Sequence, residues 1–167
     1  MIDVRNPVFW VVAALTGVGV VGLVPLLQAG FTGAPAGFIL AVILWALFAT
    51  FAWWLIRRLS RTRPRPRSAT AAAFVWGAVA ATGLGRWATG GTADILDALV
   101  ADEASASALA AGISEELLKI LGVAALSLVA ASRMRSALDF IYYGAFVGLG
   151  FMTTESLLYA AEGASTS

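Results

Sequence analysis

The chain has 167 residues, of which 60% are apolar and 13% are charged, whereas soluble proteins are usually about 45–50% apolar and about 25% charged. Eleven Lys and Arg residues stand against ten Asp and Glu residues, and the mean hydropathy is +0.86. This balance excludes a disordered chain and an electrostatic nucleic-acid binder, and it predicts an integral membrane protein. The chain has no Cys and no His, which excludes disulfides, Cys/His zinc sites and catalysis by its own thiol or imidazole groups.

Five segments are interpreted as bilayer-spanning helices, each of which needs roughly 20 mostly apolar residues. The first two carry no charge, the third is an uncharged run between Arg67 and Arg86, and the last two are interrupted by acids. A short helix is also expected on the outer membrane surface, where apolar residues recur at helical spacing opposite acids. The predicted fold is an all-α bundle of five transmembrane helices in one membrane domain, 1–167, with helices over 8–27, 37–56, 68–85, 104–132 and 139–161, a turn at 28–36 and the surface helix at 94–102.

Arginine positions predict the orientation of the bundle, because cytoplasmic loops are enriched in basic residues. Six arginines lie within 57–67, two more follow the fourth helix, and Arg5 precedes the first helix, whereas Arg86 alone lies on the opposite side. The amino end is therefore expected in the cytoplasm and the carboxyl end outside, in a multi-pass protein of the cell membrane. This topogenic role accounts for the arginine-rich stretch, so the lipid bilayer is the expected partner and nucleic acid is not.

Gly17, Gly19 and Gly22 spell G-x-G-x-x-G, which in a strand-turn-helix unit indicates a dinucleotide site. Here the motif lies within an apolar span and no strand precedes it, so it indicates close helix packing instead. Trp45 and Trp76 lie in mid-span and are likewise interpreted as packing residues.

Four ionisable side chains interrupt the last two spans, namely Glu115, Glu116, Lys119 and Glu155. Each costs roughly 2.5–3.5 kcal/mol when ionised near the bilayer centre, so such residues are paired, protonated, hydrated or bound to a cation. Lys119 is spaced at i,i+4 from Glu115 and at i,i+3 from Glu116, so it can neutralise either carboxylate but not both. The remaining charge can be balanced by protons or by a divalent cation, and these acids are predicted to form a functional site.

Glu115 and Glu155 are expected at the same depth, since each lies roughly 25 Å along its helix from the cytoplasmic end. The fourth and fifth helices are therefore expected to lie side by side, with Gly144 and Gly148 allowing their backbones to approach closely. Asp139, at the start of the fifth helix, is interpreted as a capping residue. Four hydroxyl side chains are expected to line a wet pocket around the acids, and these are Ser114, Thr153, Thr154 and Ser156.

The acids also belong to two ordered motifs. The first is E-E-x-x-K at 115–119, and the second is G-x-x-x-G-x-G-F-x-x-x-E at 144–155. Together they resemble the motifs of the PrsW family of intramembrane metalloproteases, although Ser156 stands where that family has Asn. The family's pattern continues into later helices that carry histidines, and this chain has none. The chain is therefore expected to hold the glutamate half of a protease site and to be inactive by itself.

The resemblance also implies roles for individual residues. It makes Glu115, Glu116 and Lys119 catalytic, and it makes Glu155 and Glu116 ligands of a divalent metal such as zinc. The implied substrate is a membrane-anchored protein such as an anti-sigma factor.

Three functions are weighed against one another. In the first, the chain is an intramembrane endopeptidase, in which Glu115 or Glu116 deprotonates the water that attacks a peptide bond and a metal is held partly by residues outside this chain. In the second, it is a non-catalytic scaffold that packs partner helices through glycine-rich faces. In the third, it carries protons or cations through its intramembrane carboxylates. The endopeptidase is preferred because it alone accounts for the order of residues around the acids.

Overall fold

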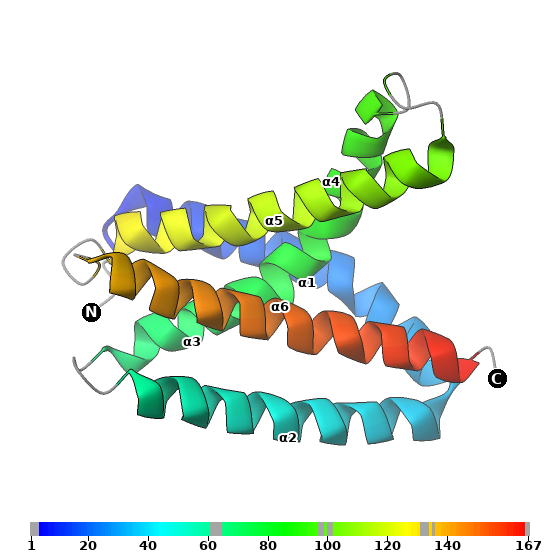
Figure 1. Ribbon diagram of the computed structural model, residues 1–167, viewed down its shortest axis with the longest axis horizontal. Coiled ribbons are helices and arrows are strands. Elements are labelled where there is room, and N and C mark those ends of the chain that lie inside the picture. The colour runs from blue at the N-terminus through cyan, green and yellow to red at the C-terminus, as the bar shows by residue number, and fades with distance from the viewer. Residues whose placement is uncertain are drawn as a thin grey trace.

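The computed structural model describes residues 4–60, 65–96, 99, 102–130, 134 and 136–165, and the regular secondary structure of these ranges is helical (Figure 1). This confirms the all-α fold. The elements are α1 (Pro7–Gly33), α2 (Pro35–Leu59), α3 (Arg67–Val75), the π-helical segment η1 (Trp76–Ala81), α4 (Thr82–Leu96), α5 (Glu103–Val129) and α6 (Ala137–Ser165). The N-terminus and the C-terminus lie at opposite ends of the bundle (Figure 1).

Among the described residues, three helices are long and apolar enough to cross a membrane, and these are α1, α2 and the continuous helix Arg67–Leu96 that α3, η1 and α4 form together. α5 and α6 contain 27 and 29 residues, which is more than the length that spans a hydrocarbon core of about 30 Å. Their acids lower their hydropathy, and α6 packs against α2, α3 and η1 within the same bundle.

Two predicted connections are wrong. The helix expected over 68–85 continues to Leu96, so 94–96 form the last turn of α4 and not a separate surface helix, while Leu99 lies in a turn. The rest of that predicted helix up to 101 lies outside the described residues. The turn expected over 28–36 is also shorter, because α1 continues to Gly33 and Ala34 alone separates it from α2. Pro35 begins α2, where a proline's missing N–H group costs no helical hydrogen bond.

The closest approach of α6 is to α3 and η1. A Cβ atom built on Gly150 would collide with the carbonyl oxygen of Phe74 and would lie 2.9 Å from the amide nitrogen of Ala78. A Cβ on Gly77 would collide in the same way with the carbonyl oxygen of Val147. The backbones of the two helices therefore touch directly through these two glycines.

The prediction that Gly144 and Gly148 bring α5 close to α6 is wrong. A Cβ atom on Gly148 would meet no atom within 4 Å, and one on Gly144 would meet only the Cγ2 atom of Val123, at 3.8 Å. These two glycines share a stripe of α6 that faces a groove, whereas Gly150 lies on a different side of the helix because each residue turns the chain by about 100°.

The glycine motif of α1 packs closely against another helix, as the sequence predicts, and the partners are η1 and α4. A Cβ atom on Gly19 would lie 2.6 Å from the carbonyl oxygen of Val79, and one on Gly22 would collide with the carbonyl oxygen of Gly83. Gly17 takes no part, since a Cβ there would meet nothing within 4 Å. Close packing is therefore confirmed for two of the three glycines.

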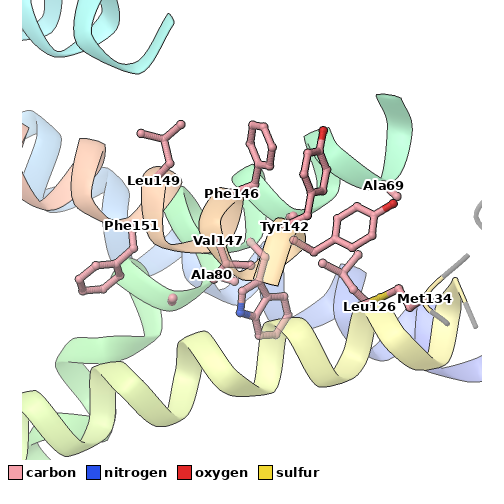
Figure 2. Packing of buried hydrophobic residues seen from close by; sticks show 13 residues of the cluster. Ala69, Ala80, Leu126, Met134, Tyr142, Phe146, Val147, Leu149 and Phe151 are labelled. Atoms are coloured by element: carbon pink, nitrogen blue, oxygen red, sulfur yellow. The ribbon is translucent and has the colours of Figure 1, made fainter. Parts of the chain in front are cut away.

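The buried core lies between the continuous helix Arg67–Leu96, α5 and α6 (Figure 2). Its largest fully buried side chains include Tyr143 and Phe146 of α6. Trp76 is 3% exposed, donates its indole N–H to the carbonyl oxygen of Leu118 at 2.9 Å, and covers Gly122, where a Cβ atom would collide with the indole ring. The predicted packing role of Trp76 is thereby confirmed.

A buried ion pair ties the start of α3 to the start of α6. Arg65 donates from Nε to Asp139 Oδ1 at 3.1 Å, and the two side chains are 8% and 5% exposed. Asp139 Oδ2 accepts from the backbone N–H of Ser136 at 3.2 Å. Asp139 therefore caps the helix from within its first turn, as the acid of a capping box does, and not as the N-cap residue that the sequence predicts. Arg65 therefore also joins the segment before α3 to the first turn of α6 through this ion pair.

Candidate active site

A cavity of about 410 Å³ lies among α1, α4, α5 and α6 and contains acids from both sequence motifs. Glu115 of α5 and Glu155 of α6 line it together, as their expected equal depth predicts, and both side chains are half-buried. The complete lining is Leu26, Thr82, Gly85, Arg86, Thr89, Glu115, Phe151, Glu155, Leu158, Tyr159 and Glu162.

Two helical stripes supply most of this lining. α4 contributes 82, 85, 86 and 89, and α6 contributes 151, 155, 158, 159 and 162, which are the i, i+3, i+4 and i+7 spacings of one helix face. The stripe of α4 holds two threonines, a glycine and an arginine, so it is hydrophilic although it begins within an apolar helix. The cavity therefore has a polar wall on each of two helices, with Glu115 between them on α5.

The π-helical segment sets which side of α4 faces the cavity. A π turn holds more residues than an α turn and so changes the rotational phase of everything that follows it. The hydroxyl of Thr82 donates to the carbonyl oxygen of Gly77 at 3.1 Å, which satisfies an acceptor within the widened turn. Thr82 and Arg86 then lie on the cavity side.

The two consecutive glutamates of α5 line different spaces. Glu115 lines the cavity, whereas Glu116 and Lys119 line a groove of about 630 Å³ between α5 and α6. Neighbouring residues on a helix point about 100° apart, and here the two glutamates point into different spaces. Lys119 Nζ lies 2.8 Å from Glu116 Oε1, so the lysine that could reach either acid pairs with Glu116. The groove is otherwise mainly apolar, and its lining includes Gly144, Val147 and Gly148.

The charges of the cavity do not cancel. Glu115, Glu155 and Glu162 bring three carboxylates against the single guanidinium of Arg86, which leaves a formal charge of −2 when all are ionised. Tyr159 lines the same cavity as Glu155. The site can thus hold water beside a carboxylate, with a cation and a phenol nearby.

The charged cavity residues that sequence reasoning missed are Glu162 and Arg86. Arg86 was interpreted only as the one basic residue on the outer side, yet it lines the same cavity as Glu115. The available signal was its position at the end of an uncharged run, followed by Thr89 at i+3. The predicted hydroxyl residues do not line this cavity. Ser114 instead shares a hydrogen bond of 2.9 Å with Thr92.

The donor set does not fit a metal centre by itself. The chain has no His or Cys, the side chains that zinc prefers. Within the described ranges, no group of three or more Asp or Glu side chains is placed to hold a metal ion. Glu116 and Glu155 line different spaces, so metal binding by this pair stays a prediction.

Comparison with known proteins points to the family whose motifs the sequence resembles. Residues 65–167 match the family described as PrsW family intramembrane metalloprotease. The matched region includes α3, η1, α4, α5 and α6, and thus every lining residue of the cavity except Leu26. No curated protein and no solved structure matches the chain.

Proposed function

Because the chain belongs to the PrsW family of intramembrane metalloproteases, we propose that it supplies the glutamate part of an intramembrane endopeptidase site. One observation supports this function above all others. Glu115 of the first motif and Glu155 of the second line one polar cavity, although 40 positions separate them in the sequence (155 − 115). A cavity with convergent carboxylates inside a membrane protein is a setting suited to water-dependent cleavage of a membrane substrate.

In this proposal Glu115 is the general base. Its carboxylate takes a proton from water while the water oxygen attacks the carbonyl carbon of a peptide bond. The same proton then goes to the amide nitrogen as the C–N bond breaks, which leaves a carboxylic acid and an amine. Arg86 is the only basic side chain of the cavity lining, so it is the group placed to face negative charge on the former carbonyl oxygen.

Glu116 and Lys119 line the groove and not the cavity. Their catalytic roles therefore stay predictions from the resemblance. The metal on which the family depends would need donors beyond the described residues. Of the two predicted ligands, Glu155 lines the cavity and Glu116 lines the groove. Glu155 is therefore the proposed ligand at the cavity, metal binding by Glu116 stays a prediction from the resemblance, and no step above passes through a metal.

We further propose that α5 and α6 also cross the membrane, giving five spans with the amino end in the cytoplasm. Their length supports this proposal, as does their packing inside the bundle. Arg57, Arg58 and Arg67 lie where α2 ends and α3 begins, at the same end of the bundle as the N-terminus (Figure 1). The expected protein is then a multi-pass protein of the cell membrane, with a membrane-anchored substrate such as an anti-sigma factor.

Cleavage of a tagged single-span membrane protein, co-expressed with the native gene product, tests the catalytic proposal. Glu115→Gln removes the base and keeps the shape of the side chain, so we expect product formation to fall about 10²-fold or more. Asp94→Asn is the matched control, since it neutralises an exposed acid of α4 that does not line the cavity. Unchanged cleavage in the Glu115→Gln variant would refute the role of Glu115.

A further inference from the structure

Lys119 lies at the boundary between the groove and the cavity. Its side chain lines the groove, and its ammonium nitrogen lies 3.9 Å from the centroid of the Phe151 ring. Phe151 lines the cavity that contains Glu115. The Lys119–Phe151 contact is therefore the partition between the two spaces, and it joins the lysine of the first motif to the phenylalanine of the second.

The backbones on both sides of this contact are already held in place. On α5, the carbonyl oxygen of Leu118 accepts the Trp76 indole N–H at 2.9 Å. On α6, the amide nitrogen of Phe151 would lie 2.9 Å from a Cβ built on Gly77, so α6 lies directly against η1 at this level. The side-chain contact between Lys119 and Phe151 is then the part of the partition that a change of charge can alter.

Lys119 and Glu116 form an ion pair, but their side chains differ in how much they are exposed. The Lys119 side chain is 21% exposed and reaches inward to the ring, whereas the Glu116 side chain is 67% exposed. An ammonium shielded from water needs a counter-charge, and the Glu116 carboxylate supplies it at 2.8 Å. Glu116 does not line the cavity itself, and its contact with Lys119 links it to the Phe151 ring that does.

We propose that Lys119 is a positioning residue that holds the Phe151 ring against the cavity of Glu115, with Glu116 as its counter-ion. The E-E-x-x-K motif is thereby divided into one cavity-facing acid and one supporting ion pair. This inference rests on the proposed function, because Glu115 is the group whose surroundings the ion pair sets.

The absence of native cysteines allows a test that needs no turnover. Cysteine introduced by Glu115→Cys is the only thiol in the purified protein, and its rate of labelling by a small water-soluble methanethiosulfonate reports access to the cavity. The rate is measured alone and combined with Lys119→Met, Lys119→Arg, Phe151→Leu or Glu116→Gln. Ala80→Cys, at a fully buried core position, is the matched control for loosening of the whole bundle.

We expect Lys119→Met, Phe151→Leu and Glu116→Gln each to raise the labelling rate at 115 about two- to fivefold, the ratio that corresponds to an ordinary cation–π contact. Lys119→Arg keeps the cation and should restore the original rate. The Lys119→Met/Phe151→Leu combination should add little to either change alone, since both remove one contact.

Three results would overturn the inference. These are an unchanged rate with Lys119→Met, an unchanged rate with Glu116→Gln, and a parallel rise at Ala80→Cys, which would mean general loosening. Failure of Glu115-dependent cleavage would instead refute the proposed function, and it would leave the labelling pattern as it is.

Discussion

Replacing Gly150 by alanine tests the closest contact of α6 with α3 and η1. The added methyl group would collide with the carbonyl oxygen of Phe74 and lie 2.9 Å from the Ala78 amide nitrogen. These are backbone atoms of a packed helix, so they cannot move aside as the end of a flexible side chain can. Overpacking of this kind costs about 1–3 kcal/mol. The helix propensity gained by replacing glycine offsets only about 0.5–1 kcal/mol of that cost.

Gly148→Ala is the matched control, because it adds the same methyl group to the same helix at a position where nothing lies within 4 Å. We expect Gly150→Ala to lower the free energy of unfolding by about 1–2 kcal/mol, and we expect Gly148→Ala to leave it unchanged or raise it slightly. Unfolding in mixed micelles, followed by circular dichroism as denaturing detergent is added, measures both variants. Equal stability of the two variants, or a larger loss for Gly148→Ala, would refute the assignment of the close contact to Gly150.

Three further expectations follow from contacts away from the cavity. Arg65→Met removes the charged hydrogen bond that the guanidinium donates to Asp139 at 3.1 Å, so the same detergent titration should show a loss of about 1.5–3 kcal/mol. Trp76→Phe removes a buried indole hydrogen bond and should cost about 0.5–1.5 kcal/mol in that assay, with Trp45→Phe, a change in a partly exposed side chain, as its control. The N–H and hydroxyl of Ser105 hold the pKa of Asp102 below its ordinary value. The cap should therefore stabilise the start of α5 above the ordinary carboxyl pKa and be lost as the pH falls through the lowered one. The protection factor of the Ser105 amide in hydrogen exchange, which removes the intrinsic pH dependence of exchange, checks this. A protection factor that falls with pH in Asp102→Asn as it does in the original protein would contradict it.

Much of the fold could be predicted because it depends on local pattern. Long apolar runs specify helices in a membrane wherever they occur, so the all-α fold and the approximate positions of the helices follow from hydropathy alone. The common depth of Glu115 and Glu155 also follows from a count along two helices, because the rise per residue is constant. The helix ends were harder to predict, since Gly30 and Gly33 are turn formers in isolation yet lie inside α1.

Which residues face one another was decided by the tertiary structure, because that depends on how each helix is rotated against its neighbours. Hydropathy cannot separate Glu115 from Glu116, which differ by a single step along α5, yet one lines the cavity and the other lines the groove. Gly148 and Gly150 are equally plausible packing residues in the sequence, and only the crossing of α6 over α3 and η1 selects Gly150.

The position of Arg86 in the cavity lining also depends on helix rotation. Its rotational position follows from the π-helical turn of η1, which no composition pattern marked. The sequence by itself determined that this is an all-helical chain rich in membrane-spanning segments and that it carries paired acids at one depth. The packing of the helices determined that Glu115, Glu155 and Arg86 line one cavity. Helix rotation sets that arrangement, and residue order does not.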